Sequence, residues 1–304
     1  MKIGVTYLYT IIKYGYPPKP ADDFKALGEI GKLGFHYLEM EGLGREHAET
    51  VLKNKAEYKS ALSANGIHVH NFCVVEPDLV SLDKTKRNLA YENFKRISEV
   101  GIYLGTETLH LASYAPPVNY RGKVPYQLDE GDYSFGDRFA LSIPDGFSWP
   151  KVWENLVESC RFCAEVAKSY GKTVIMEPRV GEIICSVDSM IRLINDVNME
   201  NFKANFDTGH FSAQRENVNL ALMKLEGMYE NIHIADNNPE NAEHLAIGDG
   251  TIDWYEFFRI LKNMNYDGYL GLDLGGREKL ADSLIRSREY IIKVAASTGC
   301  NVTW

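Results

Sequence analysis

Four side chains able to bind a metal stand at the ends of short apolar runs in the second half of the chain. Glu177 ends the run TVIME, Asp207 ends KANFD, His233 lies in ENIHIADN and Asp273 lies in GYLGLDLGG. Apolar runs of this length between helical segments are typical of buried parallel strands. Because the carboxyl ends of such strands meet at one edge of the sheet, the sequence predicts a single metal site formed by these residues.

This set of ligands favours a hard divalent ion. Carboxylate oxygens and a single imidazole suit Mn²⁺, Mg²⁺ or Co²⁺, and we take Mn²⁺ as the first choice. One strand-end carboxylate alone is more often a helix cap or an ion-pair partner, but the occurrence of such residues on successive strands favours a metal. A divalent ion beside a carbonyl and its neighbouring hydroxyl stabilises the enediolate that forms when the adjacent carbon loses a proton.

Further polar residues at strand ends are candidates for proton transfer or substrate binding. By position, the general base could be Glu177, His210, His244 or His110. Residues placed to bind sugar hydroxyls are Glu39, Glu41, His70 and His110, although a histidine inside a strand is as often a core hydrogen-bonding group. Arg179 follows Glu177 closely and could pair with an anionic substrate group or with a nearby carboxylate.

Strand and helix patterns alternate along the whole chain and predict eight strand-helix units in one domain, residues 1–304. This alternation indicates a parallel sheet, and the count is that of a closed (β/α)8 barrel, an α/β fold with catalytic loops at the carboxyl ends of its strands. An open doubly wound sheet is the alternative, but its glycine-rich turn is incomplete in GLGREH at residues 42–47. Strands are expected at residues 2–9, 35–41, 68–75, 108–114, 173–179, 203–210, 230–237 and 268–276, and helices at 21–33, 45–65, 82–101, 151–170, 187–197, 218–226, 254–264 and 281–297.

A long insertion, residues 115–149, follows the fourth expected strand. A βα loop usually has about 2 to 6 residues, and much longer loops are usually lids or binding surfaces. We therefore expect a lid or a partner surface, with packing of its own aromatics over the barrel rim as the alternative. Its aromatic residues are Tyr120, Tyr126, Tyr133, Phe135, Phe139, Phe147 and Trp149.

The composition limits the partners. The chain of 304 residues has 33 Lys and Arg against 42 Asp and Glu, a net charge of −9, which argues against nucleic acid as the main partner. The 5 cysteines are scattered, and the pair Cys160 and Cys163 fits buried thiols better than a redox or zinc motif. The amino-terminal stretch lacks the apolar segment of a signal peptide, and no run is long enough to span a membrane, so a cytoplasmic protein is expected.

Four ordered motifs carry a resemblance to a known family. They are E-P at Glu177, N-x-D-T-G-H at residues 205–210, H-I-x-D-N at 233–237 and H-L-x-x-G-x-G-x-I-D-W at 244–254. Together they resemble the sugar phosphate isomerase/epimerase superfamily, whose xylose isomerase-like barrels include D-tagatose 3-epimerase and inosose dehydratase. The resemblance covers the chain outside the insertion. It implies that Glu177, Asp207 and His233 bind the metal and that His210 and His244 face the substrate.

Two departures from the family pattern concern the chemistry. His244 stands where the ketose 3-epimerases usually have arginine. Asp273 stands where the family usually has glutamate as fourth metal ligand and proton-transfer group. The missing methylene retracts the carboxylate by roughly 1.5 Å, and a misplacement of this size can cost about 10²-fold when a proton must move. Two-carboxylate epimerisation is therefore open to question, and Asp273 remains a candidate catalytic residue.

The functions that follow are of three kinds. The first is a metal-dependent isomerase or epimerase of a ketose or related polyol. The second is a metal-dependent lyase acting on an inosose or a 3-oxo-glycoside, resembling inosose dehydratase or the barrel subunit of bacterial C-glycoside deglycosidases. The third is a barrel that binds a sugar without turning it over. The endonuclease IV branch needs more metal-binding histidines and a basic surface. The resemblance implies a homo-oligomer, and the lyase interpretation adds a small β partner subunit.

Overall fold

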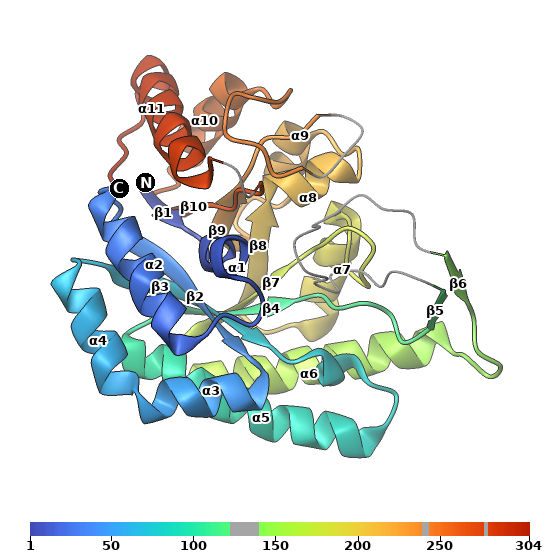
Figure 1. Cartoon of the computed structure of the whole chain (residues 1–304). Helices are drawn as coiled ribbons and strands as arrows, with labels where there is room; N and C mark the ends of the chain where they lie inside the picture. The colour runs from blue at the N-terminus through green and yellow to red at the C-terminus, as the bar shows by residue number, and fades with distance from the viewer. Residues whose placement is uncertain (122–139, 239–242, 277–278) are drawn as a thin grey trace.

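Parallel strands close into a barrel in the computed structural model, which describes residues 1–121, 140–238, 243–276 and 279–304 (Figure 1). Each strand pairs in parallel with the next, and the last pairs with the first through Val5 and Leu272. The predicted (β/α)8 barrel is thereby confirmed. Around the ring the strands are β1 (Lys2–Val5), β2 (Tyr37–Leu43), β3 (His68–Val75), β4 (Thr108–Ala112), β7 (Thr173–Glu177), β8 (Phe202–Asp207), β9 (Tyr229–Ile234) and β10 (Tyr269–Leu272).

Helices surround the barrel and connect its strands (Figure 1). The helix expected over residues 45–65 is two helices, because the chain leaves helical geometry at Asn54. The expected strand over residues 2–9 is shorter, because the pairing of β1 with its neighbours ends at Val5. The helices are α1 (Leu8–Tyr14), α2 (Pro20–Lys32), α3 (Gly44–Lys53), α4 (Lys55–Ala64), η1 (Pro77–Val80), α5 (Lys84–Leu104), α6 (Trp149–Ser169), α7 (Val187–Val197), α8 (Thr208–Ala213), α9 (Val218–Lys224), α10 (Trp254–Asn263) and α11 (Leu280–Thr298).

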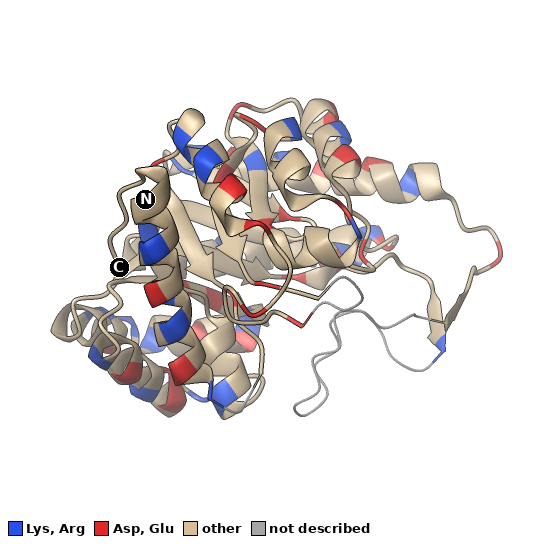
Figure 2. Cartoon of the chain, turned by 90° about the horizontal axis from the view of Figure 1, so that it is seen from above, with Lys and Arg blue, Asp and Glu red and all other residues tan. Residues whose placement is uncertain are grey.

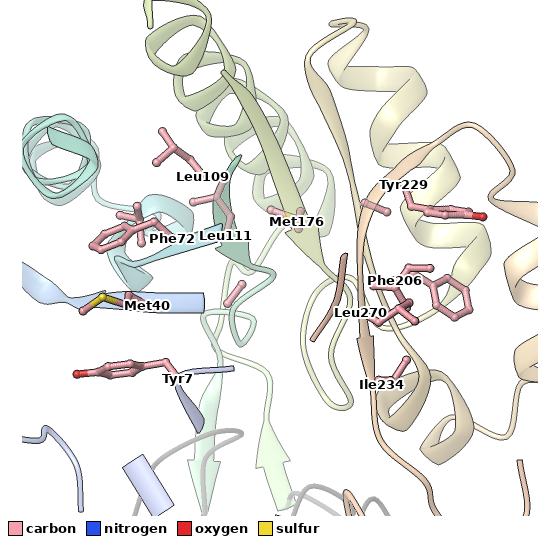
Figure 3. Close-up of a cluster of buried hydrophobic side chains, with 14 of the residues drawn as sticks. Tyr7, Met40, Phe72, Leu109, Leu111, Met176, Phe206, Tyr229, Ile234 and Leu270 are labelled. Atoms are coloured by element: carbon pink, nitrogen blue, oxygen red, sulfur yellow. The ribbon is translucent and has the colours of Figure 1, made fainter. Parts of the chain in front are cut away.

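The apolar core lies between the strands and the surrounding helices, and Figure 3 shows part of it, including Phe72, Phe206 and Leu270. Successive side chains of a strand point to opposite faces, so the residues between these apolar positions face the barrel interior. That interior is polar along several strands. It holds the buried side chains Glu39, Asn71, His110, Asn205, Asn231 and His233.

The insertion adds a two-stranded antiparallel sheet that is separate from the barrel (Figure 1). Its strands are β5 (Asn119–Arg121) and β6 (Ala140–Ser142). Residues 122–139 lie outside the described residues, and they include Tyr126, Tyr133, Phe135 and Phe139. The role of the insertion as a lid or partner surface therefore stays a prediction.

Acidic and basic residues alternate along the outer helices, as the ribbon colours of Figure 2 show. Among the helices within the described ranges, none is both long and apolar enough to cross a membrane.

A buried carboxylate joins the loop after β1 to two helices. Asp23 on α2 is 2% exposed and accepts hydrogen bonds of 2.5 Å from the hydroxyls of Tyr7 and of Tyr58 on α4. Burial raises the pKa of Asp23 to about 6, although both tyrosine donors lower it. Because this pKa lies above the usual 3.8, the folded state favours the protonated carboxyl.

We expect Asp23→Asn to remove part of the pH dependence of stability. The contribution of the Asp23 proton is fully present below pH 3.8 and is lost as the pH rises through about 6. The free energy of unfolding of the wild type, relative to that of Asp23→Asn, should therefore fall by on the order of 3 kcal/mol between about pH 4 and 7. Urea unfolding at several pH values measures this difference. The difference between wild type and the neighbouring variant Asp22→Asn, which keeps Asp23, should show no such fall. Equal curves for wild type and Asp23→Asn would contradict the expectation.

Candidate metal centre and active site

The barrel brings three of the four predicted metal ligands together at the carboxyl ends of its strands. Glu177 is the last residue of β7, Asp207 is the last residue of β8, and His233 lies one residue before the end of β9. Asp207 and His233 are register partners. One ligand atom from each of the three residues lies within 4.8 Å of those of the other two, and all three side chains are buried.

His233 uses its two ring nitrogens differently. Nδ1 lies 2.7 Å from Glu177 Oε1 and 3.7 Å from Asp207 Oδ2, without the alignment of a hydrogen bond. Nε2 lies 3.0 Å from Glu39 Oε2 on the other side of the ring. Burial lowers the pKa of His233, but Glu39 and Glu177 raise it well above its usual range. A carboxylate at Nε2 favours a proton there, so Nδ1, which faces Glu177 and Asp207, is the nitrogen that would hold a metal ion.

The side chains present fit a divalent ion. Asp207 Oδ1 accepts a 2.7 Å hydrogen bond from the backbone N–H of His210, whereas the buried Oδ2 has no hydrogen-bond partner in the described part of the chain. Burial and, after it, the neighbouring carboxylate of Glu177 raise the pKa of Asp207 to about 7. Packed carboxylates that lack full hydrogen bonding are costly to bury unless a cation pairs with them.

Asp273, the fourth predicted ligand, is engaged elsewhere. Thr6 Oγ1 donates a 2.6 Å hydrogen bond to Asp273 Oδ1, and His244 Nδ1 lies 2.9 Å from Oδ2. Burial would lower the pKa of His244, but Asp273 raises it to about 9. The short aspartate side chain thus forms an ion pair at the rim of the site. Its role as fourth ligand stays a prediction.

His210 and His244 lie beside the three-residue group. Their rings meet edge to face with centroids 4.9 Å apart, and ligand atoms of Asp207, His210 and His244 lie within 4.8 Å of one another. Burial lowers the pKa of His210 well below its usual range, and His244 lowers it further. Both predicted candidates for proton transfer are therefore next to a predicted metal ligand.

Glu39 and His110 lie directly against His233 inside the barrel. Glu39 Oε2 accepts hydrogen bonds from Asn71 Nδ2 and, at 3.1 Å, from His110 Nδ1. Burial alone would raise the pKa of Glu39, but His233 and His110 hold it well below its usual range. Sequence reasoning placed both residues in the substrate-binding set. The structure places Glu39 Oε2 3.0 Å from His233 Nε2, and the binding of substrate by Glu39 and His110 stays a prediction.

His70, a member of the predicted substrate-binding set, lies near the start of its strand. It is the third residue of β3, and its ring stacks on Tyr269, the first residue of β10, with centroids 4.2 Å apart. Burial lowers the pKa of His70 to about 3. His70 therefore lies toward the amino-terminal end of the barrel, because the strand begins only two residues earlier.

Arg179, predicted to bind substrate or pair with a carboxylate, holds Glu182 through two hydrogen bonds. Nε and Nη2 donate to Glu182 Oε2 and Oε1 at 3.0 and 2.7 Å, and Ser113 Oγ donates to the same carboxylate at 2.6 Å. The structure thus supports the ion-pair alternative. Sequence reasoning missed Glu182, whose only signal is its spacing of three residues from Arg179.

Asn205 is a second residue that sequence reasoning did not single out. Its Nδ2 donates a 2.8 Å hydrogen bond to Glu177 Oε1, and its Oδ1 accepts one of 2.9 Å from Asn231. The available signal was its place two residues before Asp207, which puts both side chains on one face of β8. Asn205 holds the Glu177 carboxylate in position toward the site.

The fold and site define a class of protein: a (β/α)8 barrel with a buried carboxylate and histidine cluster at the carboxyl ends of its strands. The family model for xylose isomerase-like TIM barrels matches residues 27–294, so the chain belongs to this family. The resemblance drawn from the sequence motifs is confirmed.

Relatives of known activity are distant. An inosose dehydratase of Clostridium botulinum is 21% identical over 90% of this chain and 89% of its own length. A 3-dehydro-D-guloside 4-epimerase of Escherichia coli is 24% identical over 84% of this chain and 87% of its own length. Other matches are partial. An uncharacterised protein of Methanocaldococcus jannaschii is 26% identical over 47% of this chain and 52% of its own length.

Solved structures share the fold at low identity. A D-tagatose 3-epimerase-like protein superposes with a TM-score of 0.73 and 19% identity, covering 98% of both chains. The 3-keto-D-glucoside 4-epimerase of E. coli gives a TM-score of 0.71 and 20% identity over 96% of this chain and 99% of that one. At these identities the likeness establishes the fold alone.

Proposed function

We propose that this protein is a divalent-metal-dependent isomerase or epimerase of a ketose or a related polyol. The observation that carries the proposal is the convergence of Glu177, Asp207 and His233, with one buried oxygen of Asp207 lacking a hydrogen-bond partner among the described residues. Mn²⁺ is the ion we propose first, with Mg²⁺ or Co²⁺ as substitutes. Relatives named epimerase, isomerase and dehydratase support this class of chemistry.

Each side chain of the site has a defined task in this reaction. A bound divalent ion would supply charge stabilisation to the enediolate. The Glu177 carboxylate, held by Asn205 Nδ2 at 2.8 Å, takes the proton from the carbon next to the carbonyl. Glu39 keeps the ring of His233 in one orientation through its 3.0 Å contact with Nε2.

Solvent deuterium exchange tests the proposal. The purified protein is incubated in D₂O with Mn²⁺ and with free ketoses, inososes or 3-oxo-glycosides, and each sugar is followed by NMR. We expect exchange of the hydrogen next to the carbonyl, and a new isomer or epimer, for at least one of these sugars. Binding without exchange would instead favour the sugar-binding barrel, and neither binding nor exchange would overturn the proposal.

A lyase acting on an inosose or a 3-oxo-glycoside is the second candidate. The observation that favours it is that Thr6 and His244 engage both oxygens of Asp273, the carboxylate that directly follows β10. The same enolate chemistry then ends with loss of a group β to the carbonyl, and the exchange assay would show an unsaturated product in place of an epimer.

Asp273→Glu distinguishes the epimerase from the lyase as candidate functions. We expect the longer side chain to disturb the contacts with Thr6 and His244 and to lower turnover about 10-fold or more, because displacements of about 1 Å are costly in proton transfer. Steady-state kinetics and metal content are measured together. A rise in turnover would show that the carboxylate at position 273 itself moves protons. It would favour the two-carboxylate mechanism of the family.

A further inference from the structure

Glu41 is a second carboxyl group on β2 that faces the barrel interior. A Cβ atom added at Gly42 would overlap Ile97 on α5, so the Gly42 position faces the outer helices. Alternation along the strand then turns Glu39 and Glu41 inward. Glu39 is in contact with His233, and Glu41 lies two residues closer to the carboxyl end of β2, where the loops of a barrel carry its chemistry.

The position of β2 in the ring places Glu41 across from Glu177. Around the closed barrel, β10 is three strands from β7 in one direction and β2 is three strands from β7 in the other. β10 and β2 therefore flank β1, and both lie on the side of the barrel opposite β7. Thr6 and His244 hold the carboxylate of Asp273, which follows β10. Glu41 on β2 is a second carboxyl group on this side of the barrel.

The surroundings of Glu41 keep a proton on it. The side chain is partly buried and forms no hydrogen bond or ion pair to any residue that the structure describes. Burial and, after it, Glu39 raise the pKa of Glu41 to about 8, although Arg179 opposes them. The other ionisable groups that act on it are Asp273, Glu177, Cys73, Tyr7 and Tyr16.

We propose that Glu41 is the second proton-transfer residue of the site. It takes the place of the glutamate that the epimerases have at the position of Asp273. The inference rests on the proposed function. Glu177 removes the proton from the carbon next to the carbonyl, and the electron pair of that bond forms the enediolate. Glu41 then donates its proton to the same carbon from the opposite face, so Glu177 ends protonated, Glu41 ends as carboxylate, and both return to their starting states by exchange with water.

Glu41→Gln separates the two proton transfers. Conversion of substrate to product should fall by about 10²- to 10⁴-fold, the usual contribution of a positioned acid or base. Exchange of the substrate hydrogen with D₂O should persist, because Glu177 is unchanged. The Mn²⁺ affinity should stay within about 3-fold of wild type, because Glu41 lies outside the predicted ligand set. The matched control is Glu107→Gln, whose carboxylate bonds His68 and Tyr269.

Two further variants guard against a folding defect. Glu41→Asp should keep part of the conversion, and added formate should partly restore conversion by Glu41→Ala. If Glu41→Gln converts substrate at the wild-type rate, the inference is overturned and the proposed function is left intact. The same conclusion follows if this variant loses both hydrogen exchange and conversion while it retains its Mn²⁺ affinity. A wild-type protein that neither exchanges nor converts any of the sugars overturns the proposed function itself.

Discussion

Glu177→Gln is expected to reduce turnover by about 10³-fold or more and to stop exchange of the substrate hydrogen with solvent. The amide cannot accept the proton, and removal of a general base typically costs about 10²- to 10⁴-fold. The loss of one metal ligand adds to this effect. The fold should persist, because the Gln oxygen can still accept the hydrogen bond that Asn205 Nδ2 donates to Glu177 Oε1.

The measurement combines NMR exchange in D₂O with steady-state kinetics on the same preparation. Glu230→Gln is the matched control, since this carboxylate lies on the outside of the barrel and pairs with Lys203 at 2.6 Å. The control should behave as wild type. Persistent hydrogen exchange in Glu177→Gln would remove Glu177 from the role of base and would favour His210 or His244.

His233→Ala is expected to weaken Mn²⁺ binding by at least about 10²-fold. Loss of groups that only orient a metal ligand costs about 10- to 100-fold in affinity, so loss of the ligand itself should cost no less. The substitution also leaves the buried carboxylates Glu39 and Glu177 without the imidazole that lies 3.0 and 2.7 Å from them. A fall in thermal stability should therefore accompany the loss of metal.

Titration calorimetry with Mn²⁺ gives the affinity directly, and thermal unfolding with and without Mn²⁺ gives an independent readout. His36→Ala is the control, because this ring is exposed and forms its hydrogen bond with the backbone carbonyl of Gly66. Unchanged Mn²⁺ affinity in His233→Ala would show that the ion binds elsewhere, and the histidine would then be a structural residue of the barrel interior.

The sequence by itself determined the elements whose local signals agree with their packing. The strand expected at residues 68–75 and the helix expected at 187–197 have those bounds in the structure. The helix combines an apolar stripe with a Ser186 cap, and such agreement between local and tertiary preferences makes an element readable. The ligand candidates Glu177, Asp207 and His233 were readable for a similar reason, because each follows an apolar strand at the same end of the sheet.

Only the tertiary structure decided how these side chains are used. The period of a strand assigns a residue to one face, but it does not give the layer of the barrel at which that residue lies or its partner across the ring. The stacking of His70 on Tyr269 and the contact of Glu39 with His233 were therefore not predicted. The pairing of Asp273 with Thr6 and His244 depends on strands far apart in sequence meeting at the closure of the barrel. Such contacts follow from the shear and closure of the whole sheet, which no local pattern encodes.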